Sequence, residues 1–192
     1  AAMGRFAAHW CVTSEVRAEL LASDAGGQGC RESFAALLNV HVPKEARWTP
    51  GSIAKEIALQ VMPNEAVIAM LGRLRTRYRL GLVTNGGSCS QREKLRRARI
   101  SEFFSVVCIS GECGAAKPAP QMFESALREL DCVPGDAIVV GDSLRCDIEG
   151  AAALGIQSCW VDAELRSHPA ATMTIRTVLN LEAHLAAQEA AA

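Results

Sequence analysis

Residues that could hold a metal ion or a phosphate group gather in three short stretches of the sequence. The most informative stretch is Gly141–Asp147, in which an apolar run, residues 138–140, leads into Asp142, and Asp147 follows early in the next expected helix. Two carboxylates placed in this way can face one cavity and hold Mg²⁺, with water and phosphate oxygens completing the octahedron. The structural alternative is that Asp142 caps the helix and Asp147 interacts favourably with its dipole.

The second stretch places a hydroxyl at the end of an expected strand. Thr84 is followed by Asn85, Gly86 and Gly87. The side chain can donate one hydrogen bond to a phosphate, and the backbone amides of the turn can donate others. An ordinary turn, in which Asn and Gly supply the special backbone conformations, is the structural alternative.

The third stretch, Gly114–Pro118, contains Lys117. Proline suits the first turn of a helix, so Lys117 is expected just before a helix N-terminus. There its ammonium group could act as a point charge toward an anion. A solvated surface lysine is the structural alternative.

The elements around these stretches predict an α/β fold with a doubly wound parallel sheet. From Pro63 onward, helices and strands alternate, and single helices between strands give a parallel sheet that is covered on both faces. Ligands of such sheets bind beyond the carboxyl ends of the strands, which places Thr84, Gly111 and Asp142 along one edge. The expected strands are residues 80–84, 105–109, 137–140, 156–161 and 173–175. The expected helices begin after Asn64 and cover residues 91–99, 119–130, 145–153 and 179–187.

The first part of the chain has a different pattern of expected secondary structure. Residues 1–62 indicate helices only, and the predicted division is a small all-helical cap, residues 1–62, and an α/β core, residues 63–192. The expected cap helices are residues 6–10, 14–22, 31–38 and 53–61, with breaks at residues 26–29, Pro43 and Pro50–Gly51.

Composition narrows the class of partner. The 20 basic and 21 acidic residues leave a net charge of −1, and only nine aromatic residues are present (Trp 3, Tyr 1, Phe 5). Nucleic acid and anionic membranes are therefore not expected as partners, and a small molecule is. No apolar run approaches the length of a membrane span, and the first residues lack the charged and apolar regions of a signal peptide. The eight cysteines include no Cys-x-x-Cys pair, and we interpret them as reduced thiols of a cytoplasmic protein.

In this order, the three stretches resemble the second, third and fourth motifs of the haloacid dehalogenase superfamily. The resemblance covers roughly Met62–Leu185 and includes shorter details such as Phe103–Phe104 and Ser110–Glu112. These details are similar to the phosphatase subgroup that has a helical cap inserted after the first motif. That subgroup contains nucleotide, sugar-phosphate and phosphoglycolate phosphatases.

The resemblance implies a role for each motif residue. Thr84 would donate a hydrogen bond to the transferring phosphoryl group, assisted by the backbone amides of Asn85 and Gly86. Lys117 would neutralise charge between the nucleophile and the phosphoryl oxygens. Asp142 would ligate Mg²⁺, and Asp147 would ligate it or orient its water. Dehalogenases of the superfamily need no metal, so this carboxylate pair favours a phosphatase of small phosphorylated metabolites.

The superfamily's first motif, Asp-x-Asp at the end of a strand, is absent. The one Asp before position 131 is Asp24, which follows a helical pattern and is interpreted as a loop residue. In the family pattern, the missing strand would lie upstream of Ala1 and pair between the strands that end at Thr84 and Asp142. Without it two strand edges stay unpaired, which is costly for backbone hydrogen bonding and favours a homo-oligomer.

Two explanations of the absent motif stay open. In the first, these 192 residues are a shortened version of a phosphatase and are inactive by themselves because the nucleophile is missing. In the second, the protein has diverged into a non-catalytic phosphate-binding, metabolite-binding or interaction protein.

Overall fold

The computed structural model describes residues 35–36, 39–40 and 47–191. By its internal contacts the chain forms two compact units, one of residues 1–63 with 89–99 and the other of residues 64–88 with 100–192. The expected helices at residues 6–10 and 14–22, the breaks at residues 26–29 and Pro43, and Asp24 lie outside the described residues, and the division after residue 62 stays a prediction.

The described part of the first unit contains helix α4 (Pro50–Leu59). Thr49 caps it: the amide of Ser52 donates to Thr49 Oγ1 at 3.1 Å, and the amide of Thr49 donates to Ser52 Oγ at 2.9 Å. This reciprocal pair satisfies two amides that a helix start leaves without partners. The expected break at Pro50–Gly51 was wrong, because Pro50 takes the first helical position, where its missing N–H costs nothing.

Helix α6 (Ser88–Ala98) is joined by one hydrogen bond to α4 and by a second to the segment that follows α4. Ser90 Oγ donates to the carbonyl of Ala54 at 3.1 Å, and Arg97 Nε donates to the carbonyl of Val61 at 3.4 Å. This is the expected basic helix, and it begins three residues earlier than predicted.

The second unit is built on parallel strands, which confirms the α/β class. Strand β1 (Gly81–Thr84) pairs with β2 (Val106–Ile109), and β4 (Gln157–Val161) pairs with β3 (Ile138–Gly141) on one side and β5 (Met173–Ile175) on the other. The strands form a two-stranded and a three-stranded sheet. Among the described residues no ladder joins β1 to β3, so the single sheet expected from the sequence is divided at this point.

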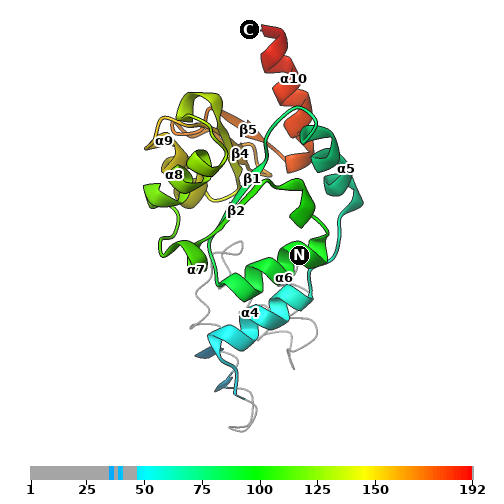
Figure 1. Cartoon of the computed structure of the whole chain (residues 1–192), viewed down its shortest axis with the longest axis vertical. Helices are drawn as coiled ribbons and strands as arrows, with labels where there is room; N and C mark the ends of the chain where they lie inside the picture. The colour runs from blue at the N-terminus through cyan, green and yellow to red at the C-terminus, as the bar shows by residue number, and fades with distance from the viewer. Residues whose placement is uncertain (1–34, 37–38, 41–46, 192) are drawn as a thin grey trace. The chain divides into compact units, whose positions relative to one another are not determined.

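Helices connect and cover these strands (Figure 1). Their bounds are α5 (Glu65–Leu74), α7 (Ser110–Cys113), α8 (Pro120–Glu129), α9 (Gly150–Ala152), α10 (Leu181–Ala191) and the π-helical segment η5 (Leu144–Glu149). Single 3₁₀ turns are η3 (Ser101–Phe103), η4 (Pro134–Asp136) and η6 (Val178–Asn180).

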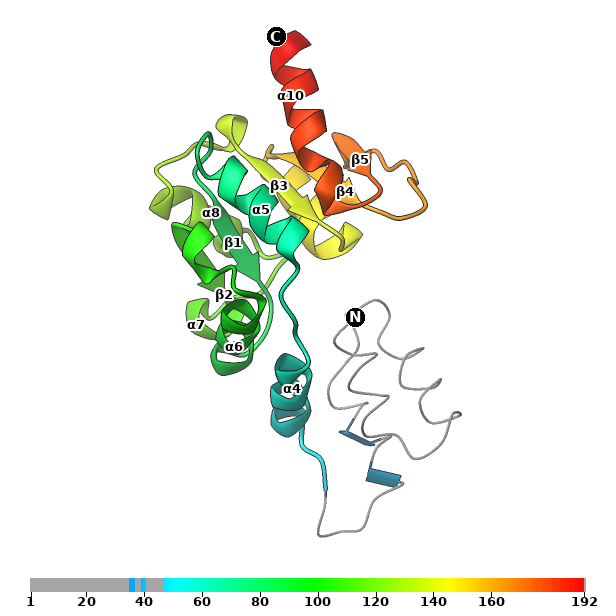
Figure 2. The same ribbon diagram turned by 90° about the vertical axis from the view of Figure 1, so that its right-hand side faces the viewer.

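Helices α5 and α8 lie on opposite sides of the strands (Figures 1 and 2). The predicted cap of α5 is confirmed, since Asn64 Oδ1 accepts from two amides of the first turn, at 3.1 and 3.3 Å. The buried face of α5 packs against β4 and β5 of the three-stranded sheet. Helix α8 packs on both sheets, with Met122 against β2 and Phe123 against residues around β3.

Burial differs between the strands in an unusual way. Strands β2 and β4 are largely buried, whereas every residue of β3 and the last three of β1 are only half-buried. The sequences of β1 and β3 are apolar, and such runs are typical of strands buried on both faces. Their partial exposure follows from the missing neighbour on one side of each strand.

The described cysteines are all free thiols, and Cys11 and Cys30 lie outside the described residues. Burial raises the pKa of the Cys108 and Cys159 thiols to about 11. None of the described helices has the length and apolarity needed to cross a membrane.

Candidate active site

Two of the residues predicted from sequence are in direct contact. Lys117 Nζ donates to Asp147 Oδ1 at 2.5 Å, and the side chains are 13% and 8% exposed. Lys117 belongs to the loop before α8, whose first residue is Pro120. The expectation that Pro118 takes the first helical turn was therefore wrong, and Pro120 has that place.

Glycine brings Asp147 to this position. A Cβ on Gly141 would lie 2.3 Å from Asp147 Oδ2, so the carboxylate packs directly on the backbone at the end of β3. A Cβ on Gly150 would lie 2.9 Å from the Phe123 ring and 3.3 Å from Pro118 Cα. Gly141 thus lets the Asp147 carboxylate approach the backbone closely. Gly150 lets the helix after Asp147 approach the loop that carries Lys117. Neither glycine has a role that the sequence alone predicts, although both flank the pair Asp142 and Asp147.

The Asn85 side chain holds the backbone of Lys117. Its Nδ2 donates to the Lys117 carbonyl at 2.9 Å, and the Lys117 amide donates to Asn85 Oδ1 at 2.8 Å. The side-chain amide therefore mimics one peptide group of a strand pair. Sequence reasoning used only the backbone amide of Asn85, and it missed this contact between the stretch at Thr84–Gly87 and the stretch at Gly114–Pro118.

The amide of Gly86 is already engaged. It donates to Ser110 Oγ at 2.9 Å, and the Gly111 amide donates back to the Gly86 carbonyl at 3.1 Å. A phosphate that used the Gly86 amide would share it with the hydroxyl. Ser110, at the start of α7, is therefore a neighbour of the site, although from the sequence it was named only as a detail of the resemblance and was given no role.

Asp142 is exposed and lies directly after β3. The structural alternative for it was wrong: Ser143 is the N-cap of η5, and its Oγ accepts from the Cys146 amide at 3.2 Å. Within the described residues the Asp142 carboxylate has no hydrogen bond or ion pair. Thr84 ends β1 half-buried, beside Asn85, and its hydroxyl likewise has no described partner.

The carboxylate oxygens of Asp142 and Asp147 are the kind of ligand that a hard divalent cation prefers, but some of them are already engaged. The Asp142 carboxylate is available, whereas Asp147 already accepts from Lys117 at Oδ1 and from the Ser143 amide at Oδ2, at 3.1 Å. No group of three or more His, Cys, Asp or Glu suited to a metal occurs among the described residues. Mg²⁺ is commonly bound through one or two carboxylates plus substrate phosphate and water. Asp142 and Asp147 fit this mode of Mg²⁺ binding, in which the protein supplies few of the ligands.

A hollow of about 520 Å³ lies between the turn after β1 and the segment that leads to Lys117. It is lined by small residues whose backbone groups are accessible: Gly86, Gly87, Ser110, Gly111, Gly114, Ala115 and Ala116. The absence of large side chains leaves room next to the loop that leads to Lys117.

Comparisons with known proteins agree with this geometry. Residues 31–161 match the family of haloacid dehalogenase-like hydrolases. The chain is 37% identical over 126 residues to human N-acylneuraminate-9-phosphatase, covering 63% of this chain and 51% of that protein. It is 31% identical to the pyrimidine 5'-nucleotidase YjjG of Escherichia coli, covering 79% of this chain and 67% of that protein. The chain spans about half the length of the first curated relatives it matches.

A solved structure shares the fold. The magnesium-bound HAD-hydrolase candidate YfnB of Bacillus subtilis superposes with a TM-score of 0.77 at 21% identity, covering 96% of this chain and 91% of that one. The family match over residues 31–161 and the relatives lead to one conclusion. The chain belongs to the haloacid dehalogenase-like hydrolases.

Proposed function

We propose that these residues form the phosphate- and metal-binding part of a Mg²⁺-dependent phosphatase that acts on small phosphorylated metabolites. The observation that carries the proposal is the Lys117–Asp147 ion pair, together with the Asp142 carboxylate directly after β3, which has no partner among the described residues. The curated relatives named above are phosphatases of small molecules, and YfnB was crystallised with magnesium, which supports the metal.

The proposed chemistry assigns each side chain a task. The Thr84 hydroxyl donates to a phosphoryl oxygen, and Lys117 offsets negative charge on the phosphoryl group. Asp147 holds the Lys117 ammonium in place, so the positive charge is positioned before substrate arrives. Asp142 holds Mg²⁺, which would act as a Lewis acid and template for the phosphoryl oxygens. Asp147 would orient water near the cation.

The nucleophile has to come from elsewhere. Thr84 has no base placed to activate its hydroxyl among the described residues, and a hydroxyl needs such a base to attack phosphorus. In the family, an Asp-x-Asp motif supplies both the nucleophile and the general acid. We propose that an added strand carrying this motif pairs between β1 and β3, where the two sheets are divided. The 192-residue chain alone is then expected to be inactive.

Phosphate release tests the proposal. The 192-residue chain and a version extended upstream by a strand that ends in Asp-x-Asp are assayed with Mg²⁺ against sugar phosphates and nucleotides. We expect turnover by the extended chain alone, abolished by Lys117→Ala or Asp142→Ala. Arg128→Ala, which changes an exposed α8 residue outside the site, is the matched control and should leave turnover intact.

Other outcomes separate the alternatives. Strong turnover by the 192-residue chain, removed by Asp142→Ala, would show that it contains a nucleophile and that our account of the missing motif is wrong. If neither version releases phosphate yet both bind phosphate esters, the non-catalytic binding protein becomes the better description.

A further inference from the structure

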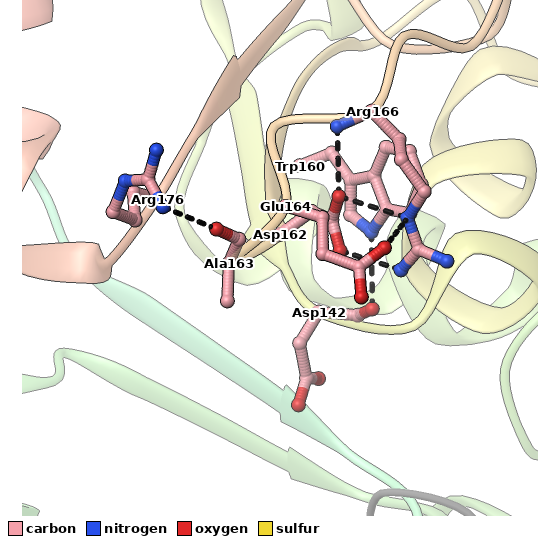
Figure 3. A network of polar contacts seen from close by, with 7 residues as sticks. All are labelled: Asp142, Trp160, Asp162, Ala163, Glu164, Arg166 and Arg176. Atoms are coloured by element: carbon pink, nitrogen blue, oxygen red, sulfur yellow. Dashed lines mark hydrogen bonds and ion pairs between the residues drawn. The ribbon is translucent and has the colours of Figure 1, made fainter.

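The backbone of Asp142 is bound by a side chain from the neighbouring strand. The indole Nε1–H of Trp160, on β4, donates to the Asp142 carbonyl at 3.1 Å (Figure 3). Trp160 is 6% exposed. A buried indole N–H needs an acceptor, and here the acceptor belongs to the candidate metal ligand.

The peptide group between Asp142 and Ser143 is held at both of its polar ends. Its carbonyl, from Asp142, accepts from Trp160, and its N–H, from Ser143, donates to Asp147 Oδ2 at 3.1 Å. With both polar ends bonded, the plane of this peptide is fixed, and with it the position of the Asp142 Cα atom. Figure 3 shows the Asp142 carboxylate pointing away from Trp160 and Arg166. The backbone after Asp142 is therefore held in place, while its carboxylate has no bond to any of the described residues.

Trp160 is in turn held by a clasp, which we define as Asp162 and Arg166. Arg166 Nε and Nη2 donate to the two oxygens of Asp162 at 3.0 and 2.6 Å, and its backbone amide donates to Oδ2 at 2.8 Å. The guanidinium carbon lies 5.3 Å from the Trp160 ring centroid, within the range of a cation–π contact. The clasp is anchored to the sheet by the Asp162 amide, which donates to the Ile175 carbonyl at 2.9 Å.

We propose that Trp160 is a positioning residue for metal binding, and that the Asp162–Arg166 clasp keeps its ring in place. The inference rests on the proposed function, because it takes Asp142 as the Mg²⁺ ligand. Without the indole donor, the peptide after Asp142 gains freedom to rotate, so the carboxylate has to be ordered when the cation binds. Ordering the carboxylate costs free energy, and this lowers the affinity for the ion.

The test is Mn²⁺ binding to the 192-residue chain, followed by the EPR signal of the free ion. Mn²⁺ takes the same octahedral oxygen ligands as Mg²⁺. Trp160→Phe keeps an aromatic ring and removes the N–H, and we expect Mn²⁺ affinity to fall about threefold to tenfold, the effect of one ordinary hydrogen bond. Trp48→Phe is the matched control and should bind as the parent chain does. Asp142→Asn should remove the specific binding.

The outcomes distinguish this inference from the proposed function. If Asp142→Asn abolishes binding and Trp160→Phe does not weaken it, the positioning role is wrong and the metal site stands. If the parent chain shows no binding that depends on Asp142, both fail together.

A second variant tests the proposal even if Trp160→Phe folds poorly. Arg166→Ala changes an exposed side chain and keeps the indole. We expect weaker Mn²⁺ binding with an unchanged circular dichroism spectrum, together with faster solvent exchange of the Trp160 indole proton by NMR. Parent-like affinity and exchange in Arg166→Ala would overturn the role of the clasp.

Discussion

The Asp147 carboxylate occupies the space where a side chain at position 141 would begin. An ordinary Cβ contact is 3.4–4 Å, and here the distances to Asp147 Oδ2 and Cγ would be 2.3 and 2.4 Å. The carboxylate is also fixed by Lys117 and by the Ser143 amide. Any residue except glycine at position 141 must therefore displace a group that two other contacts hold.

Gly141→Ala should destabilise the protein and loosen the ion pair. Forcing a methyl group into filled space typically costs about 1–3 kcal/mol of unfolding free energy. Urea denaturation followed by circular dichroism measures the change. Gly135→Ala is the matched control, because a Cβ there has nothing within 4 Å. Equal stability of the two variants would mean that Asp147 moves aside freely.

The clasp predicts a pH dependence of stability. The side-chain hydrogen bonds from Arg166, followed by its backbone N–H, lower the pKa of Asp162 from its ordinary value of 3.8 to about 2. A carboxylate whose pKa is depressed by folding adds stability that is complete above the unfolded pKa and is lost as the pH falls through the folded one. Parent chain and Asp162→Asn are compared by urea denaturation from pH 6 to pH 2. We expect the difference between them to shrink from about pH 4 downward, and a constant difference would contradict this.

The candidate site residues could be named from the sequence, whereas their contacts could not. Thr84, Lys117, Asp142 and Asp147 could be chosen because their types and positions after strands suit phosphate and metal. The Asn85 clamp on Lys117 and the Trp160 bond to Asp142 join residues 32 and 18 positions apart. Such pairings depend on strand register and helix approach, which no local pattern specifies, so sequence reasoning could not find them.

Among the elements, helix α5 is the one whose start is best defined. Asn64 accepts from the amides of Ala66 and Val67, which the helix itself leaves without partners. The Met70, Leu71 and Leu74 side chains then lie on one buried face. Capping signal and apolar period agree here, which is why the predicted and observed starts coincide. The helix after Asp142 was less predictable, since it divides into π-helical η5 and the short α9.

Asn64→Ala removes this cap, and we expect a loss of about 1 kcal/mol in unfolding free energy. Asn64→Asp keeps an acceptor oxygen and should remain near the parent value. Chemical denaturation of the three proteins in one buffer measures the difference. If Asn64→Asp is as unstable as Asn64→Ala, the oxygen is not what stabilises the start of α5.

At the scale of the whole second unit, the open question is how the two sheets are joined. Helix α8 packs on both, and α5 lies on the other side of the strands (Figure 2). Parallel strands, crossover helices and the order of the elements could all be predicted from the alternating pattern. The division between β1 and β3 could be anticipated only through the resemblance to a family whose first motif is absent here, since β1 and β3 themselves read as ordinary buried strands.

Hydrogen exchange can test the consequence of this division. Strand β4 has a partner on both sides, whereas β1 and β3 each have one among the described residues. Backbone amides that face the unpaired side lack a ladder acceptor, so some amides of β1 and β3 should exchange much faster than those of β4. Uniform protection of all three strands at low protein concentration would contradict this. Protection that increases with concentration would indicate that a second copy covers the edges, as a homo-oligomer would. In the chain extended by an Asp-x-Asp strand, we expect β1 and β3 to become protected without dependence on concentration, because the added strand would pair with both edges and bring its carboxylates beside Thr84 and Asp142.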